Sequence, residues 1–126
     1  MSMSPEFKEH LLDLLSPMGP VQAKRMFGGG GLFLDGTMFG LVADDVLYLK
    51  ADDENRADFD AAGAPPFTYQ RQGRTLALGY FQAPDDIMDD AEALAEWCRK
   101  AWEAGRRSGT KTKRRRKKST RERGAA

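Results

Sequence analysis

The chain has 126 residues, of which 40% are hydrophobic and 31% are charged, a composition typical of one globular domain. No apolar run approaches the roughly 20 residues that a membrane-spanning helix needs. One cysteine, Cys98, excludes an internal disulfide, and a single histidine, His10, leaves no His/Cys set for zinc. The first residues do not form a basic segment followed by an apolar one. We therefore expect a cytoplasmic protein without a metal or cofactor.

The net charge of +1 conceals two parts of opposite sign. Residues 1–105 hold 9 Lys and Arg against 18 Asp and Glu, a net −9, and residues 106–126 hold 11 against 1, a net +10. The second part has no apolar side chain larger than alanine, so it cannot bury enough surface to offset the entropy of ordering. The sequence predicts a folded domain over 1–105 and a Lys/Arg-rich tail over 106–126 that is disordered when unbound.

The first half of the chain predicts one helix followed by an antiparallel meander. Ser4 and Pro5 are typical of a helix start, and the helix should end by about residue 16 with Phe7, Leu11, Leu14 and Leu15 on one face. Asp35-Gly36 is a strong signal for a two-residue hairpin turn, and Asp44-Asp45 turns the chain again. Strands are expected over residues 21–27, 32–34, 37–42 and 46–50.

The second half predicts a helix, a hairpin and a last helix. Three acidic residues over 52–54 precede a helix to about Ala62, which Gly63 ends. Residues 67–71 and 74–81 form the hairpin, and Asp89-Asp90 cap a helix that ends at Gly105 or Gly109. The apolar face of that helix is regular: Leu94, Trp97, Cys98, Ala101 and Trp102. The order predicts an α+β fold, an antiparallel sheet of hairpins with about three helices packed on it.

The glycine run Gly28–Gly31 has two interpretations. A bulge or tight turn with positive φ is the simpler one. Lys24 and Arg25 lie nearby and keep open an anion-binding, small-ligand or enzymatic site. A phosphate loop, however, ordinarily leads into a helix, and here the strand over 32–34 follows.

No catalytic constellation is visible, and we expect a non-enzyme. His10 should lie at the surface or at the core boundary, and Cys98 should be a buried small hydrophobe. The paired aspartates lack the spacing of a calcium loop, so turns and helix caps explain them better than a metal site. Trp97 and Trp102 are expected in the core or at its edge.

The tail carries the strongest functional signal, because six consecutive cations can neutralise phosphates and release counterions. Such binding to nucleic acid would depend on salt and ignore sequence, since the tail holds no aromatic side chain to stack on bases. A tail without that role, or one that folds back on the acidic domain, is the alternative. The predicted nucleic-acid contacts are Arg106, Arg107, Lys111, Lys113, Arg114, Arg115, Arg116, Lys117, Lys118, Arg121 and Arg123.

Five short stretches together resemble the N-terminal domain of the TfoX/Sxy competence regulators, over about residues 5–105. The resemblance lies in Arg25-Met26-Phe27-Gly28-Gly29 with Asp35-Gly36, Met38-Phe39-Gly40-Leu41-Val42, Leu47-Tyr48-Leu49-Lys50, Pro66-Phe67-Thr68-Tyr69 and Leu94-Ala95-Glu96-Trp97. It implies a bacterial regulator of DNA-uptake competence that acts beside a cyclic-AMP receptor protein. The chain resembles those regulators only in their first half, as a stand-alone copy of that domain.

The resemblance supplies no catalytic residues. The motif Arg25, Met26, Phe27, Gly28 and Gly29 is expected to be structural or to bind a partner, with the glycines making a turn. The leading hypothesis is a regulatory or adaptor protein whose domain binds the transcription machinery or another regulator, while its tail binds DNA. The alternative is a protein-interaction module whose tail is incidental. The sequence predicts no membrane partner and does not indicate an oligomeric state.

Overall fold

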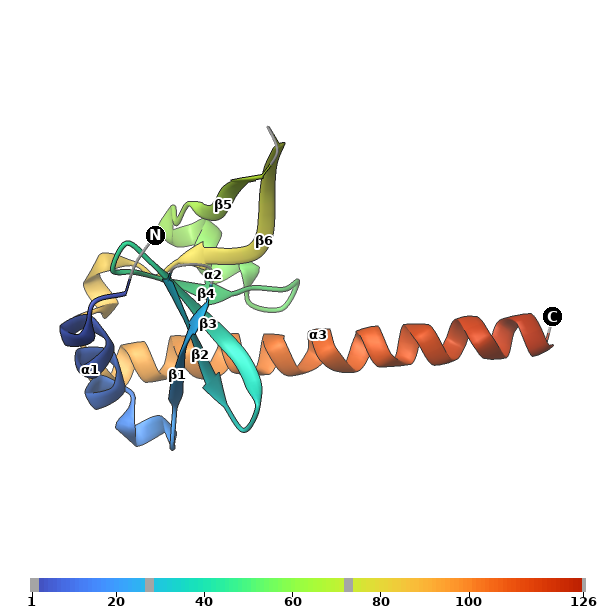
Figure 1. Cartoon of the computed structure of the whole chain (residues 1–126), viewed down its shortest axis with the longest axis horizontal. Coiled ribbons are helices and arrows are strands. Elements are labelled where there is room, and N and C mark those ends of the chain that lie inside the picture. The colour runs from blue at the N-terminus through green and yellow to red at the C-terminus, as the bar shows by residue number, and fades with distance from the viewer. Residues whose placement is uncertain (1–2, 27–28, 72–73, 126) are drawn as a thin grey trace.

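The computed structural model describes the backbone of residues 3–26, 29–71 and 74–125, and the side chains in these ranges except those of residues 69–71, 74–78 and 109–125. Six strands form one antiparallel sheet in the order β1-β2-β3-β4-β6-β5 (Figure 1). The strands are β1 (Gln22–Met26), β2 (Gly29–Leu34), β3 (Thr37–Ala43), β4 (Val46–Lys50), β5 (Pro66–Arg71) and β6 (Arg74–Gln82). The helices are α1 (Pro5–Leu14), α2 (Arg56–Ala62) and α3 (Ala91–Ala125), with 3-10 turns η1 (Ser16–Met18) and η2 (Asp85–Ile87). The predicted α+β fold and the meander are confirmed.

The helix starts form as predicted. The Ser4 hydroxyl accepts a hydrogen bond from the Phe7 amide at 3.1 Å, which satisfies one of the free N–H groups at the start of α1. At the start of α3, the Asp90 carboxylate accepts from the Ala93 amide at 3.1 Å. Forming each cap costs little chain entropy, because the side chain and its partner are three residues apart.

Two tight turns set the register of the meander. Asp35 and Gly36 join β2 to β3 with φ of 51° and 78°. Asp44 and Asp45 join β3 to β4 with φ of 52° and 56°. Positive φ at both central residues is the geometry of a type I′ turn, whose twist matches that of the strands it joins. The hairpin signal at Asp35-Gly36 is therefore confirmed.

The prediction that the glycine run is a turn with positive φ is wrong for Gly29, Gly30 and Gly31. These residues are buried inside β2 and pair with β1 on one side and β3 on the other. A side chain would collide there, with the Val42 carbonyl at Gly29 and with the Met3 side chain at Gly30. Their amides lie in the sheet, so they are not free to cradle a phosphate. Gly28 and Phe27 lie outside the described residues.

The helices pack on one face of the sheet. The main core joins Leu11 and Leu15 of α1, Phe59 of α2 and Leu94 and Cys98 of α3 to the inward side chains of the strands. Phe59 also stacks on Phe81 and meets the edge of Trp97, with ring centroids 5.4 and 5.2 Å apart. The predicted apolar faces of the first and last helices are confirmed as the faces that meet the core.

Gly105 does not end the last helix, because α3 continues through it. Gly105 lies where α3 crosses β3, and a Cβ atom there would be 2.6 Å from the Met38 carbonyl oxygen and 3.0 Å from the Thr37 methyl group. The glycine thus lets the helix approach the sheet backbone. By contrast, the prediction that Gly63 ends α2 is confirmed, since Gly63 takes the left-handed conformation at φ 66°.

The predicted boundary at residue 106 falls inside α3. Residues 106–108 are helical, and Arg107 contacts the domain. The helical backbone then runs on to Ala125, away from the sheet (Figure 1). The side chains of residues 109–126 lie outside the described part of the chain, and the disorder of the unbound tail stays a prediction.

Candidate functional site: a groove beside the last helix

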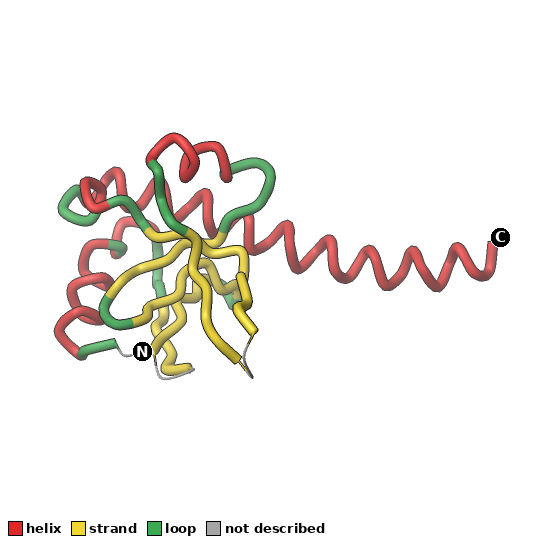
Figure 2. The backbone as a smooth tube through the Cα atoms, turned by 90° about the horizontal axis from the view of Figure 1, so that it is seen from above, coloured by secondary structure: helices red, strands yellow, loops and turns green. Residues whose placement is uncertain are grey.

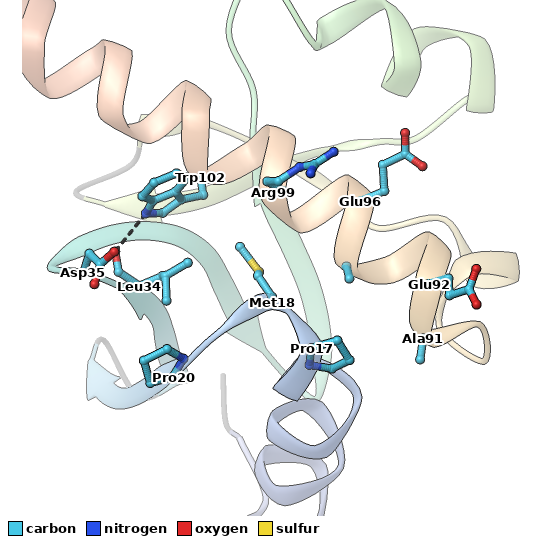
Figure 3. A pocket seen from close by; sticks show the side chains of 11 residues that line it. Pro17, Met18, Pro20, Leu34, Asp35, Ala91, Glu92, Glu96, Arg99 and Trp102 are labelled. Atoms are coloured by element: carbon cyan, nitrogen blue, oxygen red, sulfur yellow. Dashed lines mark hydrogen bonds between the residues drawn. The ribbon is translucent and has the colours of Figure 1, made fainter.

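A groove of about 740 Å³ lies between the first three turns of α3 and the segment that joins α1 to β1 (Figure 3). Its far end is closed by the turn between β2 and β3. The sequence analysis did not anticipate it, because its walls come from three segments far apart in the chain. The lining residues are Pro17, Met18, Pro20, Leu34, Asp35, Ala91, Glu92, Ala95, Glu96, Arg99 and Trp102.

Trp102 holds the closed end of the groove in place. Its indole Nε1 donates a hydrogen bond to the Leu34 carbonyl oxygen at 2.8 Å (Figure 3). The Arg106 guanidinium lies 5.0 Å from the centre of the indole ring, a cation–π distance. The expectation that Trp102 lies at the core edge is confirmed, and its second role is to tie α3 to the end of β2.

The groove combines an apolar floor with an ionisable rim. Met18 lies between Pro17 and Pro20 on one wall, and Glu92, Glu96 and Arg99 lie along α3 on the other (Figure 3). The lining includes no serine, cysteine or histidine that could act as a nucleophile or base. Such a surface suits an apolar side chain with a cation beside it, which is a property of a protein-binding site.

A second contact fastens α3 to the loop after β4. The Arg107 guanidinium donates from Nε to Asp52 Oδ2 at 2.6 Å and from its second nitrogen to Asp52 Oδ1 at 2.9 Å. Glu54 adds an ion pair at 3.0 Å. The hydrogen bond from Arg107 is the main reason that the pKa of Asp52 lies below its usual value, and it raises the pKa of Arg107 in return.

The loop itself is braced by Asn55, the buried polar residue of this region. Its Oδ1 accepts from the Asp52 amide at 2.7 Å, and its Nδ2 donates to the Lys50 carbonyl at 3.0 Å. The Asp52 carboxylate in turn accepts from the Glu54 amide at 3.0 Å. Asp52 is therefore held in place before Arg107 reaches it, which reduces the entropy lost when the ion pair forms.

Comparison with known proteins places this fold in a family. The sequence profile of the TfoX N-terminal domain matches residues 13–105. This chain belongs to the TfoX N-terminal domain family. It is 28% identical over 99 residues to the DNA transformation protein TfoX1 of Aliivibrio fischeri (strain ATCC 700601 / ES114), covering 79% of this chain and 47% of that protein. It is 29% identical over 76 residues to the protein Sxy of Escherichia coli (strain K12), covering 60% of this chain and 36% of that protein. The chain thus spans less than half the length of these relatives.

The described residues of the motif that carries the TfoX resemblance, Arg25, Met26 and Gly29, lie in paired strands. Gly29 pairs with Met26 at the end of the β1–β2 hairpin where the chain connects the two strands. Met26 is half-buried, and Arg25 is exposed. Lys24, beside the motif, lies 5.0 Å above the ring of Phe33. The described motif residues are thus placed by strand pairing, and partner binding by Arg25 stays a prediction.

The other residues that the sequence singled out lie apart from one another in this TfoX domain. His10 is exposed and lines a smaller groove of about 290 Å³ between α1 and η2. Cys98 is fully buried, and burial raises the pKa of its thiol well above the usual range. Within the described residues, no three His, Cys, Asp or Glu side chains gather as metal ligands would. No helix in that part of the chain is both long and apolar enough to cross a membrane.

The tail residues predicted to bind nucleic acid divide into two groups. Arg106 contacts Trp102 and Arg107 contacts Asp52, so each of these two cations already has a partner within the domain. The other nine, from Lys111 to Arg123, have side chains outside the described part. One spacing signal for the Arg107 contact is present: Arg107 lies three residues after the buried Ala104, on the same side of α3.

Proposed function

We propose that this protein is a non-enzymatic regulatory adaptor, whose TfoX N-terminal domain binds a protein partner while its basic C-terminal segment binds nucleic acid without sequence preference. The observation that carries the proposal is the charge division of the chain, a net −9 over residues 1–105 and +10 over residues 106–126. Membership of a family that contains a DNA transformation protein supports a role near DNA.

The basic segment suits this role physically. Six cations in a row, Lys113 to Lys118, place like charges three and four residues apart, which weakens a free helix. Phosphates would remove that repulsion, so the segment should gain helix when it binds a polyanion. α3 continues into the segment without a break, so a helical tail would extend directly from the groove and the Arg107 contact.

The groove is the proposed partner site. Its apolar floor and the carboxylates of Asp35, Glu92 and Glu96 fit a short segment that offers apolar and cationic side chains together. The tail of this chain offers cations but no large apolar group, so it does not match the floor. A component of the transcription machinery, or another regulator, is the partner class that the family suggests.

The nucleic-acid part is tested by fluorescence anisotropy with a labelled duplex of random sequence. The full chain is compared with a variant in which Lys113, Lys117, Lys118 and the three arginines between them become Gln. A control variant, Lys8→Gln with Lys100→Gln, removes two exposed cations from helices of the domain. We expect the tail variant alone to lose duplex binding near physiological salt; equal binding by both variants would refute the proposal.

The partner part is tested by Ala95→Gln, which fills the groove from its α3 wall. The readout is a two-hybrid signal against RNA polymerase subunits and transcription regulators from the same organism. We expect Ala95→Gln to abolish a positive signal that the tail variant keeps. A signal that survives the filled groove would place the partner elsewhere.

A further inference from the structure

The sheet and the helices of the domain carry charges of opposite sign. All 18 Asp and Glu of residues 1–105 lie outside the six strands, although five of the nine Lys and Arg lie within them. Strand propensity explains part of this division, because Asp is more strongly depleted from strands than Lys, but it does not explain where on the sheet the lysines lie. The cations in the strands are Lys24, Arg25, Lys50, Arg71 and Arg74.

The sheet face opposite the helices is built from strand residues alone. Its buried centre is Leu41, Ala43 and Phe67, and the half-buried side chains packed around it are Met38, Tyr48 and Tyr80. In Figure 2, the helices lie along one side of the strands and no described helix lies on the other. The face is therefore a surface of partly exposed rings and methionines, made without any helical cover from the described residues.

Two lysines stand over aromatic rings on this face. Lys24 Nζ lies 5.0 Å from the Phe33 ring centre, and Lys50 Nζ lies 5.2 Å from that of Tyr80. Strand register confirms that they share the face, since Lys24 pairs with Gly31, two residues before Phe33, and Lys50 pairs with Tyr80. The pKa of Tyr80 is raised to about 12 by burial, so its hydroxyl stays protonated and can donate.

Protection of a sheet edge explains only one of these lysines. Charged residues on an edge strand prevent pairing with other chains, and Lys24 lies on the edge strand β1. Lys50 lies on β4, an interior strand with β3 and β6 on either side. A cation above a ring on an interior strand calls for another explanation.

Rings flanked by cations are the arrangement that holds single-stranded nucleic acid, because bases stack on the rings while the cations meet the phosphates. A duplex would not fit this use, since its bases are already stacked. The described polar groups of the face are two lysines, two tyrosine hydroxyls and the Gln22 and Gln82 amides, and none is a carboxylate that would repel phosphate. Stacking and phosphate contact are open to single-stranded DNA and RNA alike, because both carry bases and phosphates.

We propose that the helix-free face of the sheet, around Lys24, Phe33, Tyr48 and Lys50, binds single-stranded nucleic acid by base stacking and phosphate contact. The proposal does not depend on the tail, which carries no rings. It differs from the adaptor function above in the residues that act and in the strandedness of the nucleic acid.

The test uses the full chain with all nine cations from Lys111 to Arg123 replaced by Gln, so that these tail cations cannot contribute. The probe is a labelled oligothymidylate of about 12 nucleotides, within the length that one small domain covers. We expect Phe33→Leu, which keeps an apolar side chain, to weaken binding by about 5-fold or more, as loss of one stacked base would. Lys24→Gln with Lys50→Gln should weaken binding and flatten its salt dependence.

The control Lys8→Gln with Lys100→Gln removes the same number of cations from helices and should leave binding unchanged. A second measurement does not require variants: amide NMR shifts on adding the oligonucleotide should cluster at Gly31, Met38 and Tyr48 rather than along α3. Unchanged affinity in the face variants, shifts at the groove, or self-association through this face in sedimentation would each overturn the proposal. The duplex experiment above gives its result independently of these outcomes.

Discussion

Replacing Gly105 by alanine should destabilise the protein, although the same change in most helices stabilises it. Glycine in a helix interior costs roughly 1 kcal/mol relative to alanine because it has more backbone entropy to lose. At Gly105 the added Cβ would meet the Met38 carbonyl oxygen at 2.6 Å and the Thr37 methyl at 3.0 Å. The first neighbour is backbone of β3, which cannot move without opening the sheet.

The magnitude follows from these opposing terms. Overpacking a close contact costs typically about 1–3 kcal/mol. Subtracting the helix gain of roughly 1 kcal/mol leaves a net loss of up to about 2 kcal/mol. For a domain of this size each kcal/mol lowers the melting temperature by roughly 4–8 °C, so a fall of several degrees is expected.

The assay is urea unfolding of the full chain, followed by tryptophan fluorescence. The matched control is Gly109→Ala, the same substitution four residues further along α3 and beyond its crossing with β3. We expect Gly105→Ala to lower the unfolding midpoint and Gly109→Ala to leave it unchanged or raise it. A Gly105→Ala protein as stable as the parent would refute the close approach of helix and sheet.

Three further predictions concern the contacts that hold α3. Asp52→Asn should lower the free energy of unfolding by about 1 kcal/mol at pH 7. Arg107 lowers the pKa of Asp52 in the folded state. The ion pair therefore stabilises the fold fully above the unfolded-state pKa near 3.9, and this stabilisation is lost as the pH falls through the lower folded-state pKa. An equal difference between parent and variant at pH 7 and pH 2 in urea unfolding would contradict this. Trp102→Phe keeps the ring but leaves the Leu34 carbonyl without its donor, and should cost about 1–2 kcal/mol by the same assay; a neutral result would exclude that bond. Cys98 should react with a thiol reagent only as fast as unfolding exposes its side chain, so a fast reaction in native buffer would contradict its burial.

Local signals predicted most of the fold because the residues that cause each element are close in sequence. The Ser4 cap, the Asp35-Gly36 turn and the Gly63 helix end each depend on the φ preference or reach of one side chain. The glycine run was misread for the opposite reason. Gly29 is required by the Val42 carbonyl, 13 positions later, and such a contact leaves no local pattern.

The candidate sites were predicted less well than the fold. The groove needs Met18, Leu34 and Trp102 together, and no periodicity places three separate segments side by side. The Arg107–Asp52 pair was hidden in a run of cations that resembles a solvated tail. The helix-free sheet face appears only once strand register shows that Lys24 and Lys50 lie on the same side.

The central claim, that the basic segment tethers an acidic domain to nucleic acid, is tested most directly by the salt dependence of duplex binding. Each phosphate that the protein neutralises contributes about −0.9 to the slope of log K against log salt concentration. The account predicts a slope of about −5 or steeper for the full chain, since nine cations lie from Lys111 to Arg123. It predicts a slope of about −3 or shallower for the variant neutralised at residues 113–118, in which Lys111, Arg121 and Arg123 remain. A variant that keeps the slope of the full chain would contradict the account.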